Sequence, residues 1–291
     1  MRPSKKLIVR ILEKISAKYL GENIYSSLLF MRYFNKFKRT IKRKKSYKIH
    51  SDNIDKINTF EYKITSQNNE DGIIEFIFNK IPNNKIFFEI GFEFYENNSL
   101  NLIQNGWSGV LIDQNRDEVL LTKKLLNFFF PNNKVNVLRK KITKENINLI
   151  LNKDNKFQLI DFFSLDVDGN DYWILKNIQL DNIKCICIEI NSWIDKNLKK
   201  TISYDENFQY MDDGYFGASL LAYHDLLKEK NFDLIAIDSS GTNAFFVARK
   251  YSYLFEILDP IKSFKFNPYQ YSEDRKKNIL SQMKKHIFVD V

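Results

Sequence analysis

The segment of the chain with the clearest chemical potential is acidic and covers residues 164–173 (SLDVDGNDYW). Asp166 and Asp168 are two apart at the end of an apolar run, so they share one face of the expected strand. Asp171 follows a glycine turn. Like charges this close need compensation by a divalent cation, a basic group or a bound proton. These side chains could therefore act as general bases or as metal ligands.

A second acidic position follows the next apolar run, which ends with Glu189 and Asn191 on one strand face. Neighbouring strands would bring both to the rim that holds Asp166 and Asp168. Some of these acids could instead cap helices or accept backbone N–H groups, above all Asp171. We predict Asp166, Asp168 and Glu189 as catalytic residues, and Asp166, Asp168 and Asp171 as candidate metal ligands.

An earlier apolar run ends in a short glycine loop, residues 89–93 (EIGFE). Gly91 permits a tight turn and a close approach of the backbone to a ligand, and Asn98 or Ser99 could cap the helix that follows. Another run ends at Asp113, about 20 residues farther on, where an acid can accept hydrogen bonds from both ribose hydroxyls. The pair indicates an adenosine-type ligand, although nucleotide loops usually contain two or three glycines.

Seven short apolar runs would position these side chains. They cover residues 85–90, 110–113, 134–138, part of 157–167, 183–190, 232–237 and 244–248. Stretches long enough for helices separate the first five, which predicts a mostly parallel, doubly wound sheet of seven strands. Only residues 238–243 separate the last two, so we expect a hairpin that makes an edge of this α/β sheet antiparallel. In such a sheet, ligands bind beyond the carboxyl ends of the strands.

The positive charge of the chain is concentrated near its start. The chain has a net charge of +9, but residues 1–48 hold 15 Lys/Arg and 2 Asp/Glu, a net +13 that leaves −4 for the rest. Two apolar sets recur there at helical spacing on either side of Gly21. They are Leu7, Ile8, Ile11, Leu12, Ile15 and Tyr19, and then Ile24, Leu28, Met31, Phe34, Phe37 and Ile41.

Three roles are open for this basic, amphipathic helical extension. It could pack on the body as solvated helices, lie on an anionic membrane surface, or bind nucleic acid. The mildly acidic body makes nucleic acid the least favoured partner. We divide the chain into the extension (1–48), an α/β domain (49–268) and a partly helical C-terminal tail (269–291).

Composition excludes several classes of protein. A chain of 291 residues with 44% apolar residues can bury a core, and 25 Phe with 15 Tyr exclude global disorder. No apolar stretch is long enough to cross a bilayer. Cys185 and Cys187 lack metal-site spacing, and reduced thiols predict a cytoplasmic protein. Peripheral attachment of the leader to the inner face of the membrane is one of the open alternatives.

Several blocks of the chain resemble the FkbM-type methyltransferase-like proteins, a branch of the class I S-adenosylmethionine (SAM) dependent methyltransferase fold. These blocks are residues 66–72 (SQNNEDG), 88–91 (FEIG) with 98–99 (NS), 106–113 (GWSGVLID), 165–173 (LDVDGNDYW), 188–191 (IEIN) and 241–247 (GTNAFFV). The resemblance therefore covers the chain from about residue 64 to residue 249.

The resemblance implies a Rossmann-like methyltransferase fold with SAM as the cofactor. It places the methionine end of SAM around Glu89, Gly91 and Glu93, and the ribose at Asp113. It also places the pair at Asp166 and Asp168 at the rim that faces the donor methyl. The chain departs from the family at residues 94–95 (FY), and it lacks the second loop glycine.

The predicted function is that of a SAM-dependent O-methyltransferase acting on a small-molecule or glycan acceptor. A sugar hydroxyl of a surface glycan is the candidate, which would be a step in polysaccharide biosynthesis, and a divalent cation could acidify that hydroxyl. One alternative is a metal-dependent glycosyltransferase, because Asp166 and Asp168 form an Asp-x-Asp pair. The other is a catalytically degenerate binding module that the leader anchors at a membrane surface.

Overall fold

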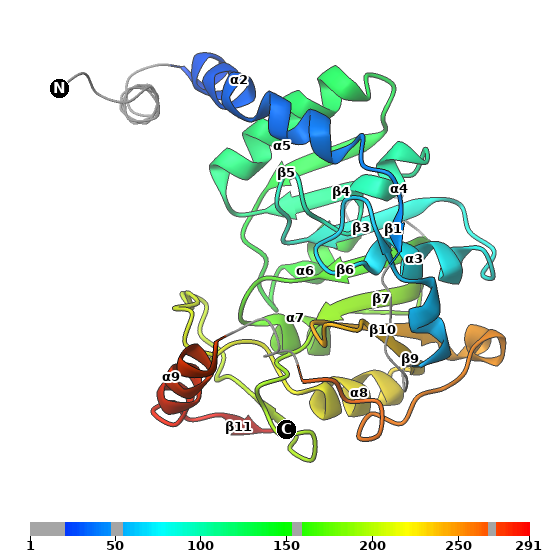
Figure 1. Cartoon of the computed structure of the whole chain (residues 1–291), viewed down its shortest axis with the longest axis vertical. Coiled ribbons are helices and arrows are strands. Elements are labelled where there is room, and N and C mark those ends of the chain that lie inside the picture. Colours follow the sequence, from blue (N-terminus) through cyan, green and yellow to red (C-terminus); the bar gives the residue numbers. More distant parts are fainter. Residues whose placement is uncertain (1–20, 48–54, 153–158, 267–271) are drawn as a thin grey trace.

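A seven-stranded sheet forms the centre of the molecule (Figure 1). The computed structural model describes residues 21–47, 55–152, 159–266 and 272–291, so the first predicted helical set, from Leu7 to Tyr19, lies outside the described residues. The strands, in their order across the sheet, are β5 (Val135–Arg139), β4 (Ser108–Asp113), β3 (Ile86–Ile90), β6 (Ile160–Leu165), β7 (Ile183–Glu189), β10 (Asn243–Ala248) and β9 (Phe232–Ile237).

The strand directions confirm the predicted doubly wound sheet. Strands β5, β4, β3, β6 and β7 are parallel neighbours, whereas β10 is antiparallel to both β7 and β9. The final hairpin does lie at the edge, but its antiparallel strand is inserted between β7 and the edge strand β9. Order and direction together give the Rossmann-like methyltransferase fold.

Helices cover both faces of the sheet, which explains why its strands read as continuous apolar runs. All residues of β6 and β10 are buried. One core cluster joins the sheet to α2 (Glu22–Thr40), α3 (Glu70–Phe78), α4 (Leu100–Gln104) and α5 (Arg116–Phe129). The other joins it to α6 (Ile147–Leu151), α7 (Asp171–Asn177) and α8 (Leu220–Glu229).

The helix α2 corresponds to the second predicted apolar set, but it buries only part of that set. Tyr25, Leu29 and Phe37 are buried, whereas Ile24 and Met31 are exposed. In Figure 1, α2 lies along α5 at the end of the molecule opposite α9. The tertiary contact with α5 therefore buries Tyr25 and Leu29, one position after Ile24 and Leu28 of the predicted set, together with Phe37, which belongs to that set.

Short elements complete the chain. They are β1 (Ser46–Tyr47), the 3₁₀ helix η1 (Lys56–Phe60), β2 (Tyr62–Lys63), β8 (Lys200–Thr201), the 3₁₀ helix η3 (Arg249–Leu254), α9 (Glu273–Met283) and β11 (Val289–Asp290). The strand β1 pairs with β2, and β11 pairs with β8. Among the described residues, no helix combines the length and the apolar character that a bilayer crossing requires.

Candidate functional site

A cavity of about 450 Å³ opens at the carboxyl ends of β3, β4, β6 and β7. This volume lies within the range of small-molecule sites. The cavity wall includes every predicted site residue except Asp171, and these residues are Glu89, Gly91, Glu93, Asp113, Asp166, Asp168 and Glu189. The fold thus brings together side chains that are up to 100 residues apart in the sequence.

The glycine turn after β3 is packed directly against the end of β6. Gly91 has a φ of +79°, and a Cβ at this position would overlap the carbonyl oxygen of Asp166. The Gly91 N–H donates to the Ile112 carbonyl (2.9 Å), and the Asp166 N–H donates to the Ile90 carbonyl (2.9 Å). Only glycine fits this turn, because it has no side chain and tolerates the left-handed backbone conformation.

Glu89 organises the loop that follows Gly91. Its buried carboxylate accepts hydrogen bonds from the backbone N–H groups of Asn98 and Ser99, each at 2.9 Å, and burial raises its pKa to about 7. Ser99 occupies the N-cap position of α4, as predicted, but its side chain makes no capping hydrogen bond. The side chain of Asn97 accepts the N–H of Leu100 at 2.7 Å instead.

Asp113 lies at the end of β4, beside the glycine turn. Its carboxylate accepts the N–H of Phe92 at 3.3 Å and that of Asn115 at 2.5 Å, and burial raises its pKa. Glu118 accepts the N–H of Phe94 at 2.7 Å, and burial raises its pKa to about 7. Both carboxylates therefore hold the loop after Gly91 through its backbone N–H groups, and both side chains line the cavity.

The two residues at which the loop departs from the FkbM-type pattern contact α2. The ring of Phe94 is buried and lies 4.9 Å from the ring of Tyr33. The ammonium of Lys36 lies 3.0 Å from the centre of the Tyr95 ring, a cation–π contact. The departure thus coincides with a packing contact between the loop and the N-terminal helix.

The predicted catalytic acids form one cluster. A carboxyl oxygen from each of Asp166, Asp168 and Glu189 lies within 4.8 Å of the other two. Burial and the neighbouring carboxylates raise the pKa values of Asp166 and Glu189 well above the usual range. Such a cluster can retain a proton near neutral pH, and its oxygens suit a hard divalent cation.

Asp171 has a different environment. It is buried, and its two oxygens accept the backbone N–H groups of Val167 (2.8 Å) and Gly169 (2.9 Å). Burial raises its pKa to about 6. These bonds shape the turn that carries Asp168, and the role of Asp171 as a metal ligand stays a prediction.

The cavity also contains residues that the site prediction missed. Gln67 and Glu70 reach it from the segment before β3, and Asn243 reaches it from β10. The Asn243 amide donates to Glu70 at 2.7 Å. The SQNNEDG block, which contains Gln67 and Glu70, was visible in the sequence as part of the family resemblance. The block alone did not indicate that these side chains line the same cavity as Gly91.

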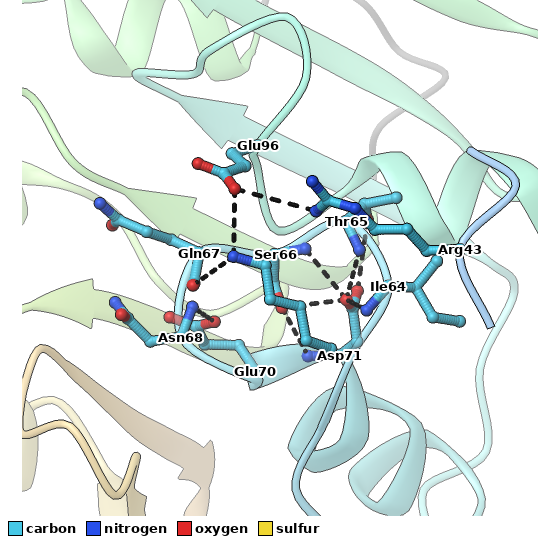
Figure 2. A network of polar contacts seen from close by, with 10 residues as sticks. Arg43, Ile64, Thr65, Ser66, Gln67, Asn68, Glu70, Asp71 and Glu96 are labelled. Atoms are coloured by element: carbon cyan, nitrogen blue, oxygen red, sulfur yellow. Dashed lines mark hydrogen bonds and ion pairs between the residues drawn. The ribbon is translucent and has the colours of Figure 1, made fainter. Parts of the chain in front are cut away.

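A buried carboxylate holds this segment in place (Figure 2). Asp71 accepts the backbone N–H groups of Ile64 (2.7 Å), Thr65 (2.7 Å) and Ser66 (2.9 Å), and also the Ser66 hydroxyl (2.9 Å). In Figure 2 the Gln67 side chain points away from this network. Asp71 therefore shapes the loop that presents Gln67 and Glu70 to the cavity.

The electrostatic character of the cavity is strongly acidic. Ten carboxylic acids line it, against two lysines, Lys140 and Lys141. Like charges in a concave, partly desolvated site favour a cationic guest and disfavour an anionic one. The rim next to Asp168 contains Glu206 and Phe208, and the Phe208 ring packs directly on Gly169.

Comparisons with known proteins give distant similarities. No protein-family model matches the chain. A tRNA(Ile)-lysidine synthase of Mycoplasma mycoides subsp. mycoides is 24% identical over 294 residues, which cover 97% of this chain and 61% of that protein. The chain thus spans less than two thirds of the length of this curated relative.

Several similar solved structures are methyltransferases or contain S-adenosylhomocysteine (SAH). The N-terminal domain of EvdMO1 with SAH bound is 9% identical (TM-score 0.39; 60% of this chain, 78% of that chain). A SAM-dependent methyltransferase of Clostridium acetobutylicum is 11% identical, with a TM-score of 0.40, over 60% of this chain and 88% of that chain. Magnesium protoporphyrin IX methyltransferase of Synechocystis with bound SAM is 8% identical, with a TM-score of 0.39, over 78% of this chain and 96% of that chain. The fold assignment itself rests on the strand order and directions.

Proposed function

We propose that this protein is a SAM-dependent O-methyltransferase, related to the FkbM-type proteins, that methylates a sugar hydroxyl. One observation carries the proposal. A single cavity at the carboxyl ends of the parallel strands combines a glycine turn at Gly91, an acid at Asp113 and the acid cluster of Asp166, Asp168 and Glu189.

The residues of the cavity fit SAM. SAM has a sulfonium and an ammonium group, and an acidic wall favours both. Gly91 and Asp113 line the same part of the cavity wall, and Asp113 is an acceptor suited to ribose hydroxyls. Gln67 offers an amide donor for a carboxylate at the same wall.

The acid cluster supplies the base that methyl transfer to a hydroxyl needs. SAM provides an electrophilic methyl group. A carboxylate of Asp166 or Glu189 would accept the proton of the acceptor hydroxyl as the methyl group is transferred to its oxygen. Burial and the neighbouring acids raise both pKa values, and a carboxylate with a raised pKa is a better proton acceptor at neutral pH.

The outer wall supports a sugar as the acceptor. Phe208 presents an aromatic surface beside Asp168, Asn170 and Glu206. An apolar ring with a few polar groups around it suits a pyranose, whose face is apolar and whose edge carries hydroxyls.

Calorimetry with SAM and SAH tests the cofactor. We expect both to bind the full chain, and Asp113→Asn to weaken binding about 10-fold to 100-fold, because it removes charged hydrogen bonds. Asp181→Asn, which changes an exposed acid outside the cavity, should leave affinity unchanged. Failure of SAM and SAH to bind at millimolar concentration would contradict the proposal and favour a degenerate binding module.

A divalent cation is a further part of the proposal, supported by the 4.8 Å grouping of Asp166, Asp168 and Glu189. We expect Mn²⁺ to bind with SAH present, as measured by electron paramagnetic resonance, and Glu189→Gln to abolish that binding without loss of SAH. Equal Mn²⁺ binding by both proteins would reject the cation site. Mn²⁺-dependent binding of a nucleotide sugar, without SAM binding, would instead favour the glycosyltransferase.

A further inference from the structure

The helix α2 presents an apolar stripe to solvent. Because an α-helix turns about 100° per residue, Ile24, Leu28 and Met31 fall on one face, opposite the face that packs on α5. Ile24 is 52% exposed and Met31 is 64% exposed, and Leu28 between them is half-buried. An exposed stripe of this kind is unusual beside a well-packed core, and it indicates a contact with something outside the described chain.

The end of α5 extends this apolar surface. Phe128 is 58% exposed, and its ring meets the rings of Phe30 and Phe34 edge-on, at 5.4 Å in each case. The aliphatic stripe of α2 and the Phe128 ring thus flank the same aromatic contact between the two helices. We call the surface made by Ile24, Leu28, Met31 and Phe128 the α2/α5 face.

Cations surround the α2/α5 face. Arg32, Lys38, Arg39 and Lys42 are exposed, and Glu22 is the acid of this helix. Within the part of the chain that the structure describes, Lys38, Arg39 and Lys42 have no carboxylate partner. The sequence immediately before α2 is basic as well, with six Lys/Arg and one Glu in residues 1–20.

We propose that the α2/α5 face docks on an anionic lipid surface. Exposed aliphatic and aromatic side chains flanked by Lys and Arg are the composition of helices that lie in the membrane interface. An anionic lipid surface neutralises the cations while its acyl region receives Met31 and Phe128. Residues 1–20 fit this face less well, because their positive charge would be placed against Lys38 and Arg39. Nucleic acid would leave the apolar stripe uncovered.

Vesicle co-sedimentation of the full chain tests the proposal. We expect the protein to pellet with vesicles that contain phosphatidylglycerol, and much less with pure phosphatidylcholine vesicles or at high salt. Lys38→Glu with Lys42→Glu should lower partitioning about 10-fold or more, because each basic residue near an anionic surface contributes to binding. Met31→Ser with Phe128→Ser should also lower it, at unchanged charge.

A charge-matched control separates surface docking from net charge. Lys196→Glu with Lys228→Glu alters two exposed lysines outside the α2/α5 face, so partitioning should stay close to that of the unaltered chain. SAH affinity serves as the check that each variant is folded. Absence of vesicle binding, or an equal loss in the control pair, would overturn the proposal. Self-association that Met31→Ser abolishes would overturn it as well and assign the face to a second copy of the chain.

Discussion

Replacing Gly91 with alanine is expected to lower the free energy of unfolding by about 2–4 kcal/mol and to remove SAH binding. The left-handed backbone conformation at this position costs a non-glycine residue about 1–2 kcal/mol. The new Cβ would also overlap the carbonyl oxygen of Asp166, so the turn after β3 must separate from β6. Urea unfolding measures the first effect, and calorimetry with SAH measures the second.

Gly106 provides the matched control for Gly91. It has almost the same φ, +78°, but a Cβ there would meet no atom within 4 Å. The change Gly106→Ala therefore carries the backbone strain without the overlap, and it should cost only about 1–2 kcal/mol and leave SAH affinity intact. If Gly91→Ala and Gly106→Ala behaved alike, the close approach of Gly91 to Asp166 would have no energetic role.

Asp71→Ala is the second change for which we expect a large effect, a loss of about 4 kcal/mol in unfolding free energy. Asp71 is buried and accepts three consecutive backbone N–H groups, from Ile64 to Ser66. Alanine leaves these donors without a partner, and an unsatisfied buried donor costs about 1–3 kcal/mol. Chemical denaturation measures the loss, and weaker SAH binding should accompany it because Gln67 and Glu70 line the cavity.

An exposed acid gives the comparison for Asp71. Asp195 accepts one backbone N–H, that of Asn197 at 2.9 Å, in a solvent-exposed turn. Asp195→Ala should cost about 1 kcal/mol or less, because water can replace the lost acceptor. A loss below about 1 kcal/mol for Asp71→Ala would mean that the loop can satisfy its N–H groups in another way.

The strands of the sheet could be predicted because each one is marked by its own apolar residues. Strands covered on both faces must be apolar along their whole length, so each run was visible without knowledge of its neighbours. Gly91 and Asp113 were found for the same reason, since a turn and an acid at strand ends meet at one rim of a parallel sheet. The clustering of Asp166 and Asp168 with Glu189 followed from the same rule.

The side chains that the sequence did not place depend on contacts between distant segments. Asn243 meets Glu70 across 173 residues, and no periodic pattern records such a pair. Asp166 and Asp171 are the same residue type five positions apart, but only Asp171 is saturated by backbone N–H groups, which depends on the path of the turn. The buried face of α2 depends on packing against α5, which covers Tyr25 and Leu29 rather than Ile24 and Met31.

The contact of Phe94 and Tyr95 with Tyr33 and Lys36 joins α2 to a loop that lines the cavity. The loop at residues 92–97 has the ligand cavity on one side and α2 on the other. A ligand that orders this loop must therefore strengthen the docking of α2 by the same free energy by which docked α2 strengthens ligand binding. Through this thermodynamic linkage, a partner that holds α2 in place would raise the affinity of the cavity for such a ligand, and occupancy of the cavity would strengthen the hold on that partner.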